Sequence, residues 1–378
     1  MYSVLFLLLL TCGLSLGMII SSPIIIQDAN NSISPKTSAG EITIATPENK
    51  TYYEPMIGYY PATLGFEADN AGDDPLLCNV EETGGEINVV DNIDGHNKVV
   101  AVIDNIDADW PYFYNTFDTP QTYGTYEYWV MTTNGTGFQG LRLYSGSIID
   151  SNVGIDFVIY YDSFMYYYGS SWHNITICAN NRWYHIEIAF ECTTGGYRGI
   201  SQYKFKVWID NTEYGECGWW HTKSSADSVQ FMGGGLTQTL YIDAIGFSWD
   251  SDYNIGDNKD EGLLLSYENA TSIDWQGRSL DGATNKTILG NTTIPMPSDG
   301  QHRIQVFGND SVGTMFESDL RYFTVNTAPP VITINSPVPS QVVGSTAPNY
   351  DLTITGLYDS IWYPLDGGAT NLTASSLT

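Results

Sequence analysis

Residues 183–192 read WYHIEIAFEC, and residues 203–209 read YKFKVWI. In each stretch an apolar side chain occupies every second position, and polar or tryptophan side chains fill the positions between, except for Ala189. Because successive side chains of a β-strand point to opposite faces, this alternation predicts two strands with one face against a core. The opposite face would then present Trp183, Glu187 and Trp208.

Similar short segments follow one another between residues 58 and 250, separated by Gly, Asn and Asp. None of them shows the apolar period of an amphipathic helix. Many short strands with frequent turn residues predict an all-β protein built as a sandwich or barrel. The other segments with strand character are Lys98–Ile103, Thr125–Met131, Ile155–Tyr161 and Leu240–Ser248.

The charge balance excludes several classes of partner. The 378 residues include 43 acidic and 14 basic side chains, a formal charge of −29. Such a surface repels phosphate backbones and anionic membranes, so we expect no nucleic-acid partner. A hydrophobic content of 42% with 13% aromatics can fill a core, which excludes a disordered chain.

The first residues predict export. Residues 2–26 carry no charged side chain and are long enough for a signal peptide or for an N-terminal anchor. We expect membrane contact only through this segment or through an anchor beyond the given C-terminus. Nine N-x-S/T sequons are consistent with an extracellular or cell-surface glycoprotein. The four cysteines after this leader predict two disulfides, with three connectivities open, because exported chains form them readily.

A repeat divides the C-terminal part. SIDWQGRSLDGATNKT (residues 272–287) recurs as SIWYPLDGGATNLT (residues 360–373), at a spacing typical of an immunoglobulin-sized module. The second copy stops soon after its LDG motif and is predicted to be incomplete. The expected organisation is a leader (1–26), a linker (27–56), a large sandwich (57–255), a smaller module (256–327) and an incomplete module (328–378).

The large sandwich resembles a known superfamily. Trp183, His185 and the turn Asp210-Asn211 are similar to the central hairpin of laminin-G-like domains in the concanavalin A-like lectin/glucanase superfamily. The trailing modules resemble immunoglobulin-like repeats of prokaryotic and archaeal secreted surface proteins. The resemblance implies a jelly-roll β-sandwich, then an immunoglobulin-like β-sandwich and a truncated second repeat.

Because the superfamily includes glucanases, a pair of carboxylates in this chain could be catalytic. Retaining glucanases place two carboxylates ~5–5.5 Å apart, which alternate strand positions provide. Glu187 and Glu191 share a face, but Ala189 stands between them where such enzymes carry an acid. The resemblance places their carboxylates one strand earlier, where Asp156 is the only acid. We expect no catalytic residue; the alternative is a polysaccharide hydrolase or lyase using one of these acids.

The tryptophans suggest carbohydrate binding instead. Sugar rings have apolar faces and polar rims, so aromatic platforms with a few polar groups recognise them. The predicted site consists of Trp129, Trp183, Glu187 and Trp208. It would bind polysaccharides or glycoprotein glycans in adhesion or recognition. The competing interpretations are that the aromatic stretch at residues 164–168 covers these indoles, or that the protein is purely structural in the envelope.

Calcium is the predicted metal, because an exported acidic protein offers hard oxygen ligands. The loop at residues 250–261 resembles Asp-rich calcium loops of surface repeats, although Ile255 stands where such loops need Gly. In some sugar-binding jelly rolls a first-strand Glu and a last-strand Asp hold structural calcium. The candidate ligands are Asp250, Asp252, Asn254 and Glu261 in the loop, and Glu67 with Asp243 by that resemblance.

Overall fold

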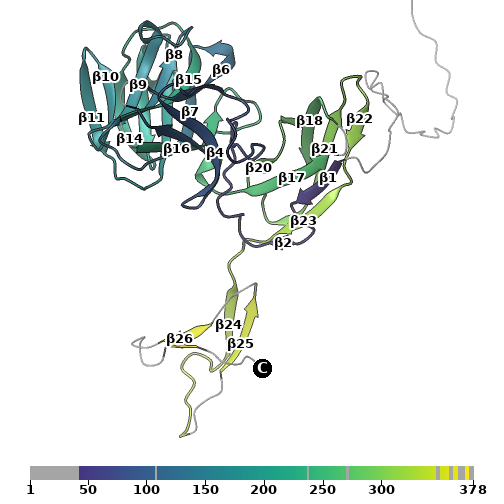
Figure 1. Cartoon of the computed structure of the whole chain (residues 1–378). Helices are drawn as coiled ribbons and strands as arrows, with labels where there is room; N and C mark the ends of the chain where they lie inside the picture. Colours follow the sequence, from purple (N-terminus) through teal and green to yellow (C-terminus); the bar gives the residue numbers. More distant parts are fainter. Residues whose placement is uncertain are drawn as a thin grey trace, which may run out of the picture. The chain divides into compact units, whose positions relative to one another are not determined.

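The structure is a computed structural model that describes residues 42–106, 109–235, 238–269, 272–345, 350–356, 361–364 and 371–373. All of these residues belong to one compact unit of the chain. Strands and three short 3-10 turns make up their regular structure, and Figure 1 shows most of the strands gathered into two sandwiches, followed by C-terminal hairpins. The predicted all-β jelly-roll class is confirmed.

The jelly roll consists of two seven-stranded sheets, here named the β8 sheet and the β12 sheet. In spatial order the β8 sheet contains β11 (Ser171–Ile177), β10 (Ser163–Tyr168), β9 (Val153–Tyr160), β8 (Phe138–Tyr144), β15 (Ala226–Gly234), β6 (Tyr112–Gln121) and β3 (Asn79–Glu81). The β12 sheet contains β14 (Thr212–Gly218), β13 (Lys204–Ile209), β12 (Tyr184–Glu191), β7 (Tyr123–Thr132), β16 (Gln238–Phe247), β5 (His96–Asp104) and β4 (Gly85–Ile93).

Period-two alternation sets which side chains enter the space between the sheets. Ile186, Ile188 and Phe190 of β12 are fully buried there, and Phe157 of β9 packs from the opposite sheet. Trp208 of β13 lies on the face turned away from this core, as the alternation predicts. The stretch at residues 164–168, which the competing interpretation made a loop over the predicted tryptophans, forms β10 in the β8 sheet.

The second sandwich includes strands from both sides of the jelly roll in the sequence. One sheet has the order β1 (Ile42–Thr46), β17 (Leu263–Asn269), β20 (Thr292–Ile294). The other has the order β19 (Lys286–Ile288), β18 (Trp275–Leu280), β21 (Gly300–Asn309), β23 (Arg321–Val325), β2 (Thr51–Tyr52), with β22 (Met315–Glu317) paired to β21. In Figure 1, β1 lies among the green strands although it carries the colour of the N-terminus.

This arrangement corrects the predicted linker at residues 27–56. Ile42 and Ile44 point into the core of the second sandwich, while Thr43 between them is exposed. The sequence ITIAT alternates with period two, and pairing with β17 gives this short strand a buried face. The jelly roll is therefore inserted in the sequence between strands of the second sandwich.

The repeated motif forms a hairpin in both copies. In the first copy β18 pairs with β19, and in the second β26 (Trp362–Pro364) pairs with β27 (Asn371–Thr373). A separate hairpin joins β24 (Val331–Ser336) to β25 (Asp351–Thr355). The leader at residues 1–26 lies outside the described residues, and within those residues no helix is long and apolar enough to cross a membrane.

The disulfide prediction is wrong. Cys78, Cys178, Cys192 and Cys217 are all free thiols. The last three are buried, and burial raises the pKa of each of the four to about 12. A thiol that stays protonated reacts slowly, so these cysteines act as small apolar residues of the jelly roll.

Candidate functional site

The structure places the predicted tryptophans on the outer face of the β12 sheet, where chain segments already occupy them. The Trp129 Nε1–H donates to the Asn258 carbonyl at 2.7 Å. Trp183 donates to the Ile93 carbonyl at 3.1 Å, and its ring centroid lies 4.0 Å from that of His96. The Arg198 guanidinium carbon lies 4.3 Å from the centroid of Trp208. All three indoles are half-buried, so each platform is already occupied by the chain itself.

Glu187 and Glu191 of β12 are also engaged by other residues of the chain. Lys259 donates to Glu187 at 3.1 Å and Arg198 forms a second ion pair with it. Although burial opposes the effect, these two cations lower the pKa of Glu187. Glu191 accepts hydrogen bonds from the Thr193 and Tyr197 backbone N–H groups at 2.7 and 2.8 Å, which fixes the following turn. Both side chains therefore have structural partners.

The outer face of the β8 sheet has a different character. A polar row crosses four neighbouring strands, since Asp156 of β9 is in register with Arg142 of β8, Arg142 with Gln230 of β15, and Gln230 with Tyr114 of β6. On each strand these residues alternate with core residues such as Leu141 and Leu143. The row therefore lies on the face turned away from the core.

Aromatic rings surround Arg142 on this face. Its guanidinium carbon lies 5.9 Å from the ring centroid of Trp110, 5.6 Å from Phe138 and 5.5 Å from Trp220, within the range of cation–π attraction. Further ring contacts at 5.0 to 6.2 Å extend the group along the sheet. We name this group the aromatic belt: Trp110, Phe138, Tyr160, Tyr167, Trp172 and Trp220.

The aromatic belt is accessible. Trp110 is 41% exposed, and the other five rings are half-buried. Beside Trp110 a cavity of about 360 Å³ opens above the polar row, with Arg142, Gln230 and Tyr112 among its lining residues. Its size and its mixture of rings with a few polar groups match the usual composition of a small-ligand site.

Arg142 holds the centre of this face through a network of ion pairs. Its Nε and Nη2 donate to the two carboxylate oxygens of Asp156 at 3.1 and 3.3 Å, and Nη1 donates to Asp150 at 3.1 Å. Burial raises the pKa of Asp156 even against the attraction of Arg142. Burial also disfavours the guanidinium cation, but Asp156 and Tyr144 together outweigh burial and raise the pKa of Arg142. The network fixes the guanidinium plane beneath the rings.

This geometry is suited to binding more than to glycoside cleavage. A retaining glycosidase needs one free carboxylate as nucleophile and a second as acid/base. Both oxygens of Asp156 are engaged by Arg142, and the alternate positions of β9 on that face are Gly154 and Val158. Around the ion pair, the rings of the aromatic belt meet at steep angles, such as 69° between Phe138 and Trp172 and 62° between Tyr167 and Trp172, with amide and hydroxyl groups beside them.

The predicted calcium-loop residues do not converge. Asp250 accepts a hydrogen bond from the Asp252 backbone, and Asn254 bonds with Asp257. Glu261 reaches away from the loop and accepts from the Gly58 backbone N–H at 2.6 Å. Among the described residues no three His, Cys, Asp or Glu side chains are grouped to hold a metal ion.

Glu67 and Asp243 are both buried, and the Asp243 charge adds to the cost of ionising Glu67. Burial raises the pKa of Glu67 to about 8, with the Asp243 charge adding to it. Burial raises the pKa of Asp243 well above its ordinary value. Asp243 lies 2.8 Å from His96 Nδ1, and burial lowers the pKa of His96 to about 4. Two carboxyls suit a hard cation, whereas the adjacent imidazole suits calcium poorly; calcium stays a prediction.

Sequence reasoning selected the tryptophans of the β12 sheet and missed the aromatic belt. The signal was present in FQGLRLY (residues 138–144), where Phe138, Arg142 and Tyr144 alternate with the core residues Leu141 and Leu143. A basic side chain at a buried strand position of so acidic a chain requires an acid on a neighbouring strand. That acid is Asp156, which the sequence had marked only as a possible catalytic residue.

Comparisons with known proteins find likeness in structure alone. No family model matches the sequence, and no curated protein matches it. Among solved structures, the chain resembles a sialidase (10% identity, TM-score 0.42, 52% of this chain and 19% of the sialidase). It also resembles the catalytic domain of a laminarinase from Thermotoga petrophila (12%, TM-score 0.32, 50% and 97%) and a Bacillus licheniformis beta-glucanase (14%, TM-score 0.31, 50% and 96%). The chain thus spans about a fifth of the sialidase.

Proposed function

We propose that this protein is an exported, non-catalytic glycan-binding protein whose site is the aromatic belt with the polar row beside it. The observation that carries the proposal is the accessible set of rings around an ion-paired Arg142. Rings of this kind stack on the apolar faces of sugars, and Gln230 and the tyrosine hydroxyls can bond the hydroxyl rim. The site is thus on the β8 sheet and not at the tryptophans of the β12 sheet.

Binding to a panel of soluble polysaccharides by affinity electrophoresis tests this proposal. We expect retention by at least one polysaccharide, reduced about fivefold by Trp110→Ala, since a ring contact of this kind contributes on the order of 1 kcal/mol. Trp208→Ala on the other sheet is the matched control and should bind as the wild type does. Equal retention of wild type and Trp110→Ala would remove the aromatic belt from the site.

The second candidate function is cleavage of the same polysaccharides, for which Asp156 is the acid on the relevant strand. A reducing-end assay on the panel separates the two functions, because a binding protein releases no new ends. Depolymerisation that Asp156→Asn abolishes would replace the binding proposal with a hydrolase. Release of unsaturated ends would indicate a lyase.

Export to the cell surface is supported by the uncharged residues 2–26 and by the exposure of sequon residues such as Asn49, Asn174 and Asn285. Expression of the full chain in a glycosylating host tests this part. We expect a secreted or surface-bound product whose mass falls after glycan removal. A product retained inside the cell without glycans would contradict it.

A further inference from the structure

Two basic side chains face each other in the second sandwich. Arg278 of β18 is in direct register with Lys286 of β19. Like charges directly opposite each other on neighbouring strands destabilise a sheet. The chain has only 14 basic side chains against 43 acidic ones, so two of them side by side are a costly use of a scarce residue type. Such a pair is stabilised by an anion.

The partners within the chain only partly satisfy these cations. The Arg278 Nε is buried and has no hydrogen-bond partner among the described residues. Burial lowers the pKa of Arg278, and the charge of Asp252 opposes that effect. Lys286 Nζ donates to the Asp252 carbonyl at 2.7 Å and lies 3.8 Å from its carboxylate. A buried guanidinium donor without an acceptor costs free energy that a bound oxyanion would recover.

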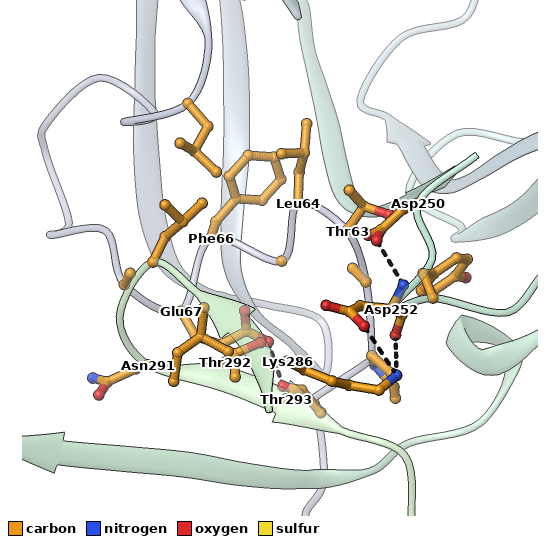
Figure 2. A pocket seen from close by; sticks show the side chains of 18 of the residues that line it. Thr63, Leu64, Phe66, Glu67, Asp250, Asp252, Lys286, Asn291, Thr292 and Thr293 are labelled. Carbon is orange, nitrogen blue, oxygen red and sulfur yellow. Dashed lines mark hydrogen bonds and ion pairs between the residues drawn. The ribbon is translucent and has the colours of Figure 1, made fainter. Parts of the chain in front are cut away.

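Both side chains line a cavity of about 600 Å³. Figure 2 shows Lys286 and Asp252 on one side of it, Thr293 with Glu67 on another, and the apolar Leu64 and Phe66 above them. Hydroxyl and amide groups of Thr63, Asn291 and Thr292 also line it. The cavity is large enough for a ligand of one or two sugar rings, and its lining combines apolar walls with hydrogen-bonding groups.

The acidic residues of the cavity limit how much negative charge it accepts. Glu67 accepts a hydrogen bond from Thr293, and its pKa of about 8 keeps it largely uncharged at neutral pH. Asp252 is the acid whose charge acts on Arg278, and Arg278 and Lys286 together exceed it by one positive charge. Asp69, Asp118, Asp250 and Asp257 also line the cavity, so a ligand with two or more negative charges would be repelled.

We propose that this cavity binds a small polar ligand through a single oxyanion group, a carboxylate or a sulfate ester, with Arg278 and Lys286 as its receptors. The site is separate from the aromatic belt and does not depend on it. Arg278 supplies planar, directed donors to the oxygens, and Lys286 supplies a compact charge beside them.

The experiment uses isothermal titration of the full chain with sodium glucuronate and with sodium methyl sulfate, both single-charged anions, at fixed ionic strength, and with glucose as the uncharged control. We expect saturable binding of glucuronate if the natural group is a carboxylate, or of methyl sulfate if it is a sulfate ester, and none of glucose. Either anion supports the proposal. The affinity should fall at least tenfold in Lys286→Gln, which removes the charge of a side chain that is 36% exposed.

Lys98→Gln is the matched control, because it removes the same charge from the jelly roll, where Lys98 pairs with Asp91. Its affinity for the anion should equal that of the wild type, as should that of Trp110→Ala. Arg278→Gln should abolish binding if this variant folds. If it does not fold, the result for Lys286→Gln tests the proposal. The proposal is overturned if neither anion binds, if glucose binds equally well, or if Lys286→Gln and Lys98→Gln have the same effect.

Discussion

Arg142 and Asp156 form a buried pair whose two members are unequal. The exposed fraction is 10% for the Arg142 side chain and 1% for that of Asp156. Removal of the cation leaves an uncompensated buried carboxyl, whereas removal of both charges leaves an apolar face. The pair thus fixes the position of the Arg142 side chain more than it adds to the net stability of the fold.

We therefore expect Arg142→Met to destabilise the jelly roll by about 3–5 kcal/mol and the double variant Arg142→Met/Asp156→Leu to restore most of that loss. Urea denaturation followed by tryptophan fluorescence measures the free energy of unfolding of each variant. Both variants should also lose glycan retention, because the guanidinium no longer supports the rings. A double variant as unstable as the single one would show that the pair stabilises the fold on balance.

Glu67 predicts a dependence of stability on pH. Burial raises its pKa in the folded protein to about 8, above the ordinary 4.5. The folded state therefore holds a proton that the unfolded state releases between these values, and stability falls as pH rises through this window. The neutral Glu67→Gln variant loses this dependence. The free energy of unfolding of the variant minus that of the wild type should therefore increase by a few kcal/mol between pH 5 and pH 8.

Urea midpoints at pH 5, 6.5 and 8 measure the difference between the two proteins. His96 acts in the opposite direction, because burial lowers its pKa to about 4 and acid therefore destabilises the folded state. It is present in both proteins and cancels in the comparison. An unchanged difference across the three pH values would contradict a buried, protonated Glu67.

At the scale of elements, β1 belongs to the second sandwich although it precedes the jelly roll in the sequence. Ile44 is 3% exposed and packs in the same core as Leu263 and Leu265. Ile44→Ala should cost about 2–5 kcal/mol through lost burial and a cavity. Calorimetry should show this loss in the transition of the second sandwich, while the exposed Thr43→Ala leaves both transitions in place. An unaffected melt would restore the linker interpretation of these residues.

The elements of the jelly roll could be predicted from sequence because alternation is a local signal. WYHIEIAFEC and YKFKVWI became β12 and β13 with the expected inward faces. What covers an outer face is decided by distant contacts, such as that between Trp129 and Asn258. Arg142 and Asp156 meet only because β8 and β9 pair in one particular register. Composition and periodicity do not specify such pairings, so the aromatic belt was missed.

Calcium binding concerns the whole molecule, because the predicted ligands come from several segments of the chain. If Glu67 and Asp243 hold an ion, deprotonation of both carboxyls must accompany binding, and affinity should rise with pH. Calorimetry at pH 8 with calcium and with EDTA measures this. A transition that rises by several degrees with calcium supports the site, and identical melts with and without chelator would remove it.

At the scale of the whole molecule, β2 and β23 bring an early and a late segment of the second sandwich together as parallel neighbours. The Thr324 N–H donates to the Lys50 carbonyl at 3.0 Å, and the Asn326 N–H donates to the Tyr52 carbonyl at 2.9 Å. Tension applied before β1 and after β23 would load these hydrogen bonds in shear, along the strand axis, so that they resist together. The intervening jelly roll would then lie outside the load path, and a glycan-binding surface could keep its shape while the chain around it bears mechanical force.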